Sequence, residues 1–543
     1  MTDPIQTWPA DLAARYRARG YWRGETFPAM LRDRAAAHPD RIALVAGDAR
    51  LSYAGLNDRA RSLGAGLLAL GLRPGDRVLI QMGNVPAFFE AVFGAFAAGL
   101  IPVYALPAHR RTELLHLAGK AAARAILVQD RIERFDHAAM VLGLRGDLPG
   151  LAHIIVAGTA PEGTLAMDAI AGDAAMLPAD PDPQSVAFCQ ISGGSTGLPK
   201  LIPRTHDDYI YSLRGSNEIC GIDAESVYMA TLPVAHNFTM SSPGHFGALY
   251  AGARVVLCPA PLPQVAFELI RREGVTITGL VPPLALLWLD AAERTPPALP
   301  SLKLLQVGGA KFLPESTRRV APLLGCRLQQ VFGMAEGLVN YTRNDDPDEI
   351  VTGTQGRPIS PDDEVLILDD AGAPVPEGTP GNLLTRGPYT IRGYHDDASA
   401  NARSFTEDGF YRTGDIVQRL PSGHLVVMGR ANDQINRNGE KISAEEVEDL
   451  LLGHPQVFDA VVVSIPDARL GERACAFIQP RDAAPTPAEL RRYMRGREVA
   501  AFKVPDEIRI VDGFATTAVG KISRRQLREI LRADVLAEEE KTP

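Results

Sequence analysis

Strand-like apolar runs alternate with helical patterns through the first two thirds of this chain. Residues 77–81 are strand-like and precede a helical pattern at 88–98, and further strand-like runs occupy 125–128 and 253–257. Such alternation is typical of parallel α/β layers. Because 543 residues exceed what a single hydrophobic core usually holds, we expect two or more domains.

The pattern changes twice in the last third of the chain. Between about residues 363 and 429, short strands alternate with Gly-containing turns, as in a compact β unit. Beyond Arg430, a charged helix at 444–452 precedes strands at 460–464 and 474–478. We therefore predict an α/β protein with a large N-terminal domain, residues 1–431, that contains a small β-barrel-like unit. A small, mobile α+β domain follows over residues 433–543.

Composition and charge exclude several classes of protein. The net charge of −9 and the lack of a strongly basic tract argue against a nucleic-acid partner. The five cysteines are scattered without a C-x-x-C pair, which fits a reducing, cytoplasmic location. No secretory signal begins the sequence. The uncharged stretch 91–106 is shorter than the ~20 residues of a spanning helix and contains Pro102, so no membrane span is expected.

The run Ser192-Gly-Gly-Ser-Thr-Gly-Leu-Pro-Lys200 directly follows a strand-like run at 185–191. Its glycines let backbone N–H groups approach an anion, its hydroxyls add donors, and its lysine adds a positive charge. Thr205-His-Asp-Asp208 resembles a capping box, so the loop is expected between a strand end and a helix start, where anions are favoured. The predicted phosphate-binding residues are Ser192, Gly193, Gly194, Ser195, Thr196, Gly197 and Lys200.

Two other motifs overlap this loop. A nucleotide-hydrolase phosphate loop places its lysine directly after the last glycine, whereas Leu198 and Pro199 intervene here. The order G-x-S-x-G also matches the nucleophile elbow of serine hydrolases, with Ser195 as nucleophile. Pro199 and Pro203 stand where the helix of that elbow would run, which makes the hydrolase the minority hypothesis. A plain turn would not need three hydroxyls and a lysine.

Four further clusters carry chemistry. Glu336 follows a glycine in Val331-Phe-Gly-Met-Ala-Glu-Gly337 and could hold a metal ion that bridges nucleotide phosphates. Asp415 ends Tyr411-Arg-Thr-Gly-Asp415 and could bind ribose hydroxyls. The other two are the polar stretch 429–441 at the domain junction and Gly520-Lys521 near the end of the chain. Each cluster alone could be an ordinary turn or surface loop. The whole set, in this order along the chain, is far more specific than any single cluster.

The ordered set resembles the adenylate-forming superfamily of acyl-CoA and aryl-CoA ligases, luciferases and nonribosomal-peptide adenylation domains, over nearly the entire chain. Within it, the sequence is most similar to the stand-alone 2,3-dihydroxybenzoate-AMP ligases of siderophore synthesis. The residues that carry this resemblance are Ile202-Pro-Arg-Thr-His-Asp-Asp-Tyr-Ile-Tyr211, Ala235-His-Asn-Phe238, Leu305-Gln-Val-Gly-Gly-Ala-Lys311 and Gln329 to Arg343.

The resemblance implies a two-step reaction that uses ATP and Mg²⁺. An aryl carboxylate first attacks the α-phosphorus of ATP, and the phosphopantetheine thiol of an aryl carrier protein, supplied in trans, then displaces AMP. By resemblance, Glu336 and Thr196 serve Mg²⁺, Asp415 and Arg430 hold ribose, and Lys521 bridges carboxylate and phosphate oxygens. Further implied nucleotide contacts are Gly309, Ala310, Val331, Phe332 and Gly333.

The same resemblance implies that the small domain rotates between the two steps. Rotation would withdraw Lys521 and present the region of Lys441 to the incoming thiol. The pivot position carries Asn432 here, where the family usually has aspartate or lysine. The charge of the pivot is therefore absent from this chain.

The acid-binding residues are implied by resemblance too. Asn237 would bind an ortho hydroxyl, Phe238 would pack on the ring, and Gly308 would give the ring room, with His236 at the mouth of the pocket or as an ordinary core histidine. In the family, serine and valine at the positions of Ser242 and Val339 accompany 2,3-dihydroxybenzoate, whereas cysteine and leucine accompany salicylate. A salicylate-AMP ligase and an aryl-CoA ligase are the alternatives.

Overall fold

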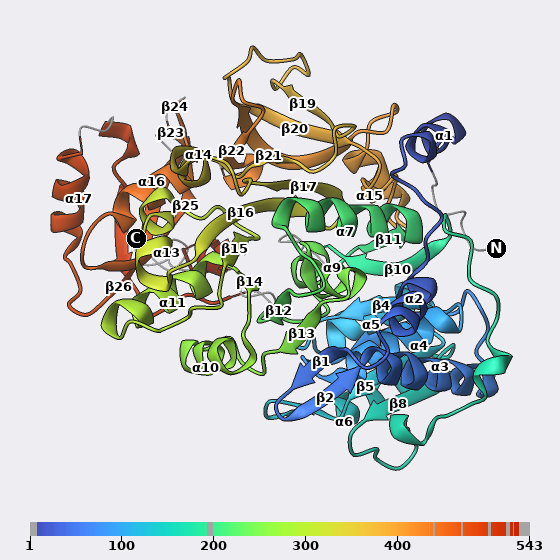
Figure 1. The fold of residues 1–543 in the computed structure, drawn as a ribbon. Coiled ribbons are helices and arrows are strands. Elements are labelled where there is room, and N and C mark those ends of the chain that lie inside the picture. The colour runs from blue at the N-terminus through green and yellow to red at the C-terminus, as the bar shows by residue number, and fades with distance from the viewer. Residues whose placement is uncertain are drawn as a thin grey trace.

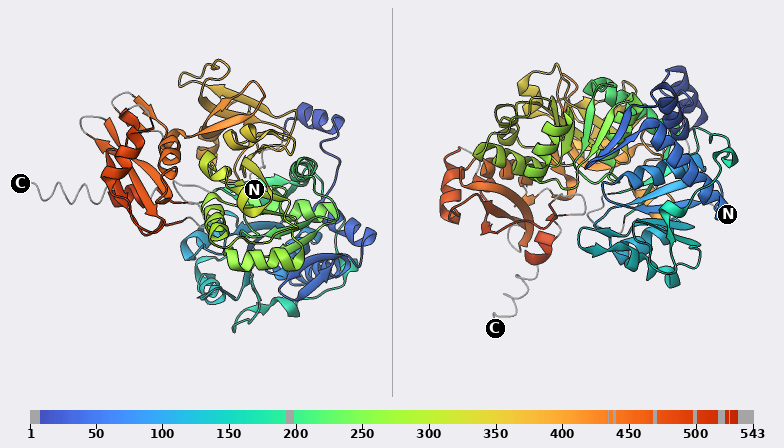
Figure 2. Two further views of the ribbon diagram at one scale, coloured as in Figure 1. Left: turned by 60° about the vertical axis from the view of Figure 1, so that its left-hand side comes forward. Right: turned by 60° about the horizontal axis from the view of Figure 1, so that its bottom comes forward.

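The computed structural model describes residues 8–192, 199–433, 435–437, 440–467, 471–497, 501–516, 522–524 and 526–531. Within these residues, the chain forms two large, mainly parallel sheets, a smaller antiparallel sheet and a C-terminal sheet (Figure 1). The C-terminal part, in orange and red, lies at one side of the molecule in all three views (Figure 2). The mixed α/β architecture with a large N-terminal part and a small C-terminal part is as predicted.

The first large sheet has seven strands in the order β11-β10-β4-β3-β5-β8-β9. Its strands are parallel except for β11, which pairs antiparallel with β10. Their bounds are β3 (Arg77–Gln81), β4 (Ile101–Ala105), β5 (Ala125–Gln129), β8 (His153–Ala157), β9 (Leu165–Ala166), β10 (Val186–Ile191) and β11 (Leu201–Thr205). The helices between them are α4 (Pro86–Ala97), α5 (Arg111–Lys120) and α6 (His137–Leu142).

The second large sheet has nine strands in the order β18-β17-β16-β15-β14-β12-β13-β1-β2. The run from β16 to β1 is parallel, and the pairs at both ends are antiparallel. The strands are β1 (Ile42–Ala46), β2 (Ala49–Ser52), β12 (Val227–Ala230), β13 (Arg254–Leu257), β14 (Ile277–Leu280), β15 (Leu304–Gly308), β16 (Arg327–Met334), β17 (Gly337–Tyr341) and β18 (Arg357–Pro358).

The two faces of the nine-stranded sheet bury different cores. On β12, Tyr228 and Ala230 pack into a core shared with α2 (Phe27–Ala37), α3 (Tyr53–Ala69), α4, α7 (His206–Cys220) and α9 (Gly244–Ala251). Val227 and Met229 pack on the other side with α10 (Pro263–Glu273), α11 (Pro282–Arg294) and α13 (Val320–Leu324). This alternation follows from the two-residue period of a strand. The sheet is therefore covered on both faces, as parallel sheets require.

The β unit predicted over residues 363–429 is an antiparallel sheet of β19 (Glu364–Leu368), β20 (Gly381–Arg386), β21 (Tyr411–Arg419) and β22 (Leu425–Arg430). Leu338 of β17 packs in one small core with Leu383, Val417 and Val427, so this sheet rests on the end of the nine-stranded sheet. Its strands β21 and β22 lead directly into the C-terminal part.

The C-terminal part is a small α+β unit. Its strands are β23 (Ile435–Arg437), β24 (Glu440–Ile442), β25 (Val457–Asp467), β26 (Gly471–Pro480) and β27 (Glu507–Ile510), with α16 (Ala444–Leu452) and α17 (Pro487–Arg495). It meets the rest of the chain where Arg481 Nη1 lies 3.2 Å from Asp290 Oδ1 of α11, and where Ser443 Oγ donates to Met428 O at 2.9 Å.

One local prediction was wrong. The loop was expected to lie between a strand end and a helix start, but it leads into a further strand, β11, which pairs back onto β10. The helix α7 itself starts at His206, directly after the predicted capping residue Thr205. Pro203 lies opposite Cys189 in this ladder, and β11 is an end strand of its sheet, where a missing N–H is tolerated. A nucleophile elbow is a strand-to-helix turn, so this geometry excludes the serine-hydrolase hypothesis.

Across the described ranges, no helix has the length and apolar character needed to cross a bilayer.

Candidate functional site

Many of the predicted site residues that the structure describes lie at one edge of the nine-stranded sheet. The parallel strands β12, β14, β15 and β16 end there. His236 to Phe238 follow β12, Gly308 to Ala310 span the end of β15, and Val331 to Glu336 span the end of β16. Ligands of α/β sheets bind outside the carboxyl ends of such strands. The topology therefore assembles, at a single edge, residues that are separated by about a hundred positions in the sequence.

The two ends of the glycine-rich loop are tied together. Ser192 N donates to Lys200 O at 3.0 Å, and Lys200 N donates back to Ser192 Oγ at 3.0 Å. The Lys200 ammonium lies 4.5 Å from the ring centroid of Tyr394, within range of a cation–π contact. Gly193, Gly194, Ser195, Thr196 and Gly197 fall outside the described residues, so their predicted phosphate contacts stay a prediction.

Tyr394 connects the loop to the predicted metal ligand. Its hydroxyl donates to Glu336 Oε1 at 2.9 Å and lies 3.3 Å from the hydroxyl of Tyr411. Burial, together with the nearby Glu336 carboxylate, raises the pKa of Tyr394 far above its usual value, so this hydroxyl stays a donor. Lys200 and Glu336 therefore lie against the same tyrosine, as binding of one phosphate chain by both would require.

The backbone around Glu336 is held from two sides. Arg204 Nη1 donates to Ala335 O at 2.8 Å, and Ile391 N donates to Glu336 O at 2.8 Å. Gly337 adopts φ +157, and a Cβ there would lie 2.5 Å from Thr390 Cα. Only glycine permits this close approach.

Glu336 fits a magnesium site of the kind completed by substrate phosphates. One carboxylate oxygen accepts from Tyr394, and no described residue donates to the other. The described residues hold no group of three or more His, Cys, Asp or Glu suited to a metal ion. Mg²⁺ is commonly bound by one or two carboxylates plus phosphate oxygens, which this single carboxylate matches.

Asp415 and Arg430 form the predicted ribose-binding pair. They face each other across the β21–β22 ladder, with Arg430 Nε 2.8 Å from Asp415 Oδ1. Arg430 Nη1 also donates to Thr413 O at 3.1 Å. Burial acts to lower the pKa of Arg430, but Asp415, Tyr411 and then Glu336 raise it on balance. The pair therefore lies within electrostatic reach of Glu336.

The Phe238 ring packs against two glycines of the nine-stranded sheet. A Cβ added to Gly308 would lie 2.7 Å from Val331 O and 3.2 Å from Phe238 Cζ, and one added to Gly279 would lie 3.3 Å from Phe238 Cζ. The Phe238 ring therefore covers Gly279 of β14 and Gly308 of β15. Gly309, next in the chain, has φ +85. Larger residues at 279 and 308 would clash with the ring of Phe238.

Val339 and Ser242, the two residues predicted to discriminate between aryl acids, both lie at β17. Val339 Cγ2 would lie 3.3 Å from a Cβ on Gly333, across the β16–β17 pair. Ser242 is buried close to Tyr341, whose pKa is raised far above normal by burial while the hydroxyls of Ser216 and Ser242 act in the opposite direction. Val339 is therefore part of β17, and Ser242 lies next to Tyr341 of the same strand.

His236 has a structural role in the described geometry. It is the N-cap of α8 (Asn237–Ser241), where its Nδ1 accepts from Phe238 N at 3.3 Å. This contact sets the orientation of the first turn, which carries Asn237 and Phe238. His236 is half-buried and so is not a core histidine, while its place at the mouth of an acid pocket stays a prediction.

The predicted pivot lies between two anchored residues. Arg430 is held by Asp415 and Thr413, while Asp433 forms ion pairs with Arg528 and, at 3.8 Å, with Arg524 Nε. Ala431 and Asn432 stand between these anchors in a 3₁₀ turn, Ala431–Asp433. The side chains of Asn432 and of Lys441, on β24, fall outside the described residues, and so does Lys521.

Sequence reasoning missed Tyr394, Tyr209 and Arg204 as parts of the site. Tyr209 donates to Asn237 Oδ1 at 2.8 Å, and Arg204 holds the carbonyl next to Glu336. Tyr209 and Arg204 lie within the segment 202–211 that carries the family resemblance, whereas Tyr394 has no comparable signal. All three act through contacts between distant parts of the chain.

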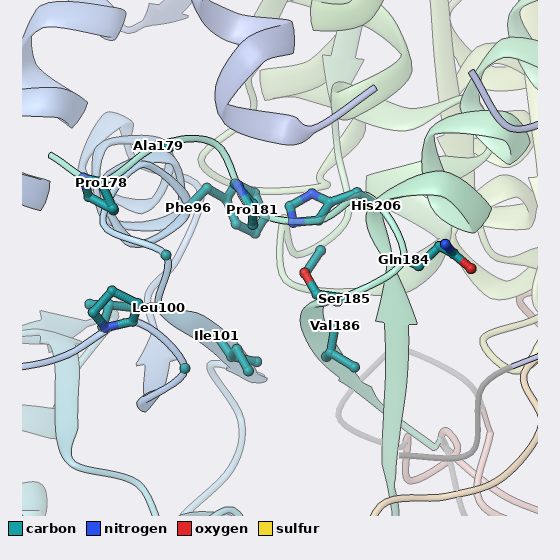
Figure 3. Close-up of a pocket in the computed structure, with 14 residues that line it drawn as sticks. Phe96, Leu100, Ile101, Pro178, Ala179, Pro181, Gln184, Ser185, Val186 and His206 are labelled. Carbon is teal, nitrogen blue, oxygen red and sulfur yellow. The ribbon is translucent and has the colours of Figure 1, made fainter. Parts of the chain in front are cut away.

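A separate cavity of about 500 Å³ opens between the 99–101 turn and the segment 178–187 (Figure 3). Its lining is mostly apolar, including Phe96, Leu100 and Val186. His206 also lines it, and burial lowers the pKa of this imidazole to about 3, so it is neutral. It lies at the amino end of β10, opposite the glycine-rich loop, and has no charged group suited to a triphosphate.

Comparison with known proteins agrees with this geometry. The profile of the AMP-binding enzyme family matches residues 31–395, and that of the AMP-binding enzyme C-terminal domain matches residues 446–521. The chain therefore belongs to the AMP-binding enzyme family, within the adenylate-forming superfamily. Its class is that of an ATP-using, adenylate-forming ligase.

Individual relatives are similar along their whole length. A 2,3-dihydroxybenzoate-AMP ligase of Bacillus subtilis is 54% identical over 530 residues, which cover 98% of each chain. A salicyl-AMP ligase / salicyl-S-ArCP synthetase of Mycobacterium tuberculosis is 47% identical, covering 96% of this chain and 93% of that one. The apo structure of MbtA from Mycobacterium smegmatis superposes with a TM-score of 0.75 at 44% identity, covering 97% and 98% of the two chains.

Proposed function

We propose that this enzyme activates 2,3-dihydroxybenzoate with ATP and transfers the aryl group to the phosphopantetheine thiol of an aryl carrier protein. The observation that carries the proposal is the arrangement of Lys200 and Glu336 around Tyr394, with the pair Asp415–Arg430 within electrostatic reach of Glu336. The names of relatives that act on 2,3-dihydroxybenzoate and salicylate support an aryl acid as substrate. The name of the salicyl-S-ArCP synthetase supports a carrier protein as acceptor.

In the first step, a carboxylate oxygen forms a bond to the α-phosphorus while the bond to the pyrophosphate oxygen breaks. The products are aryl-AMP and pyrophosphate. This step demands that two anions be brought together, which is a task of positioning and electrostatic stabilisation. Lys200 and the loop would bind the β and γ phosphates, Asp415 and Arg430 the ribose, and Lys521 the oxygens of carboxylate and α-phosphate. Mg²⁺, when bound by Glu336 and Thr196, would neutralise phosphate charge.

In the second step, the carrier thiol attacks the aryl carbonyl carbon, and AMP leaves with the bonding electron pair. The thiol proton is lost, so the products are the thioester and AMP. A turn about Ala431 and Asn432 would move residues 433–543 as one body, because Asp433 is tied to Arg524 and Arg528. The neutral Asn432 then acts as a flexible link, and the charges that anchor the joint lie on its neighbours.

We expect 2,3-dihydroxybenzoate to support ATP–pyrophosphate exchange about tenfold better than salicylate, in kcat/KM. The physical reason is the buried Ser242 hydroxyl, which can pair with the 3-hydroxyl and would cost ~1–3 kcal/mol if left unpaired. Exchange rates across a panel of hydroxybenzoates measure this preference. A tenfold preference for salicylate would contradict it, and release of free aryl-CoA with coenzyme A as acceptor would favour the aryl-CoA ligase instead.

The double substitution Ser242→Cys with Val339→Leu is expected to move the exchange preference toward salicylate by about tenfold. It removes the hydroxyl that would pair with the 3-hydroxyl and fills the space that this group needs. Ser360→Ala is the matched control, because Ser360 is another buried serine whose hydroxyl pairs with Tyr211 and has no predicted role in acid binding. An unchanged preference in the double variant would remove these two residues from the specificity pocket.

A further inference from the structure

The side chain of Asn237 is held in one orientation by Tyr209, which contacts it from α7. Tyr209 of α7 is completely buried, and its hydroxyl donates to Asn237 Oδ1 at 2.8 Å. The ring of Tyr209 packs edge-on against Phe188, with centroids 4.7 Å apart, and the Arg204 guanidinium lies 4.7 Å from its centroid. These contacts leave the hydroxyl of Tyr209 one position.

The direction of this hydrogen bond decides what Asn237 offers to a substrate. Burial raises the pKa of Tyr209 far above its usual value, so the phenol keeps its proton and acts as donor. An amide that accepts on its oxygen turns its NH₂ group to the opposite side. No described residue accepts from Asn237 Nδ2, and the atom is not among the buried polar atoms without a partner. The amide NH₂ is therefore accessible for a ligand.

A 2-hydroxybenzoate presents a matching acceptor. Its ortho hydroxyl donates the proton to its own carboxylate, so lone pairs of the hydroxyl oxygen face outward. A 2-aminobenzoate has one N–H more. It donates one hydrogen to the carboxylate and turns a second N–H outward, where it would meet the NH₂ of Asn237 as donor against donor. Discrimination between ligands often rests on such an unpaired group.

We propose that Tyr209 is a positioning residue that fixes Asn237 as a hydrogen-bond donor and thereby selects 2-hydroxy over 2-amino aryl acids. The inference rests on the proposed function, because it assumes that Asn237 faces the ortho position of the acid. It adds the reason why one ortho group is accepted and the other is refused. Tyr209 itself touches no substrate atom.

The test is the exchange rate of Tyr209→Phe with salicylate, 2-aminobenzoate and benzoate. In the unmodified enzyme, salicylate is expected to exceed 2-aminobenzoate by at least about tenfold in kcat/KM. Phenylalanine leaves the amide free to rotate, so this ratio should fall by about tenfold, mainly through KM. Benzoate has no ortho group, and its kcat/KM should change less than about threefold.

Tyr211→Phe is the matched control. Tyr211 lies on the same helix, is also buried, and donates its hydroxyl to Ser360 at 2.7 Å rather than to Asn237. Its loss should leave the ratio of salicylate to 2-aminobenzoate unchanged. A second variant, Asn237→Asp, keeps Tyr209 and offers acceptors only, so it should invert the preference toward 2-aminobenzoate.

The outcomes separate the inference from the proposed function. If none of the aryl acids supports pyrophosphate exchange by the unmodified enzyme, the proposed function and the inference are both overturned. If it exchanges, but the ratio is unchanged in Tyr209→Phe and does not invert in Asn237→Asp, the inference alone is overturned. Should Tyr209→Phe fail to fold, the result with Asn237→Asp decides: inversion supports the inference and its absence overturns it.

Discussion

Replacing Arg204 with methionine is expected to lower the free energy of unfolding by about 3–5 kcal/mol, because it leaves a buried carboxylate without its counter-ion. Arg204 and Asp208 are 2% and 0% exposed, and Nη2 of Arg204 lies 2.7 Å from Asp208 Oδ1. The guanidinium also donates to Ala335 O and to Tyr389 O, at 2.8 and 3.0 Å. Its loss therefore affects stability and the position of Glu336 together.

Denaturant unfolding and pyrophosphate exchange measure the two effects. Arg204→Met with Asp208→Asn should recover part of the lost stability, since the double variant buries no unpaired charge while the amide still caps α7. It should not recover the exchange rate, because Ala335 O remains without its donor. Arg412→Met, on the exposed face of β21, is the control and should stay within about 0.5 kcal/mol. A loss below about 1 kcal/mol in Arg204→Met would contradict the expectation.

Local patterns in the sequence were enough to predict several elements. The strand at 77–81 and the helix at 444–452 have the predicted bounds, because each is an apolar run or an amphipathic pattern ended by turn residues. The capping box at Thr205 is also confirmed. The short motifs around Glu336 and Asp415 could also be recognised from the sequence alone. Both contain a glycine at the fixed position that a strand end or a tight turn requires.

The pairing of β11 could not be predicted in this way. All five residues of Leu201–Thr205 are buried, so the strand shows no alternation, and Pro203 argues against a strand when only the sequence is considered. Its partner β10 lies across the glycine-rich loop, and nothing in the five residues encodes an antiparallel return. The strand between the loop and the capping box was missed because this long-range information is absent from the local sequence.

The tyrosines of the site escaped prediction because their contacts span the chain. The hydroxyl of Tyr394 donates to Glu336, which is 58 residues away in the sequence, and that of Tyr209 donates to Asn237, which is 28 residues away. A tyrosine in a loop or on a helix has no sequence signal for its hydroxyl partner, which only the packed structure supplies. The roles proposed for Lys521, Thr196 and Lys441 stay predictions from resemblance.

Lys521→Ala is expected to lower the adenylation rate by about 10²–10³-fold while transfer of the aryl group from preformed aryl-AMP to the carrier changes little. The ammonium would stabilise charge that moves from the carboxylate to the phosphate oxygens, and this charge develops only in the first step. The second step would take place after the small domain has turned about Ala431 and Asn432, with Lys521 withdrawn. The loss of rate should therefore be confined to the adenylation half-reaction.

Pyrophosphate exchange and single-turnover thioester formation measure these half-reactions separately. Lys503→Ala is the matched control, because Lys503 lies in the same small domain and pairs with exposed Glu446 on the surface, where an ion pair contributes about 0–1 kcal/mol. Both half-reactions should be unchanged in this control. An intact adenylation rate in Lys521→Ala would contradict the role of the terminal lysine. Equal losses in both half-reactions would instead indicate that the substitution disturbs the small domain as a whole, since a group used only before rotation cannot slow the thioester-forming step.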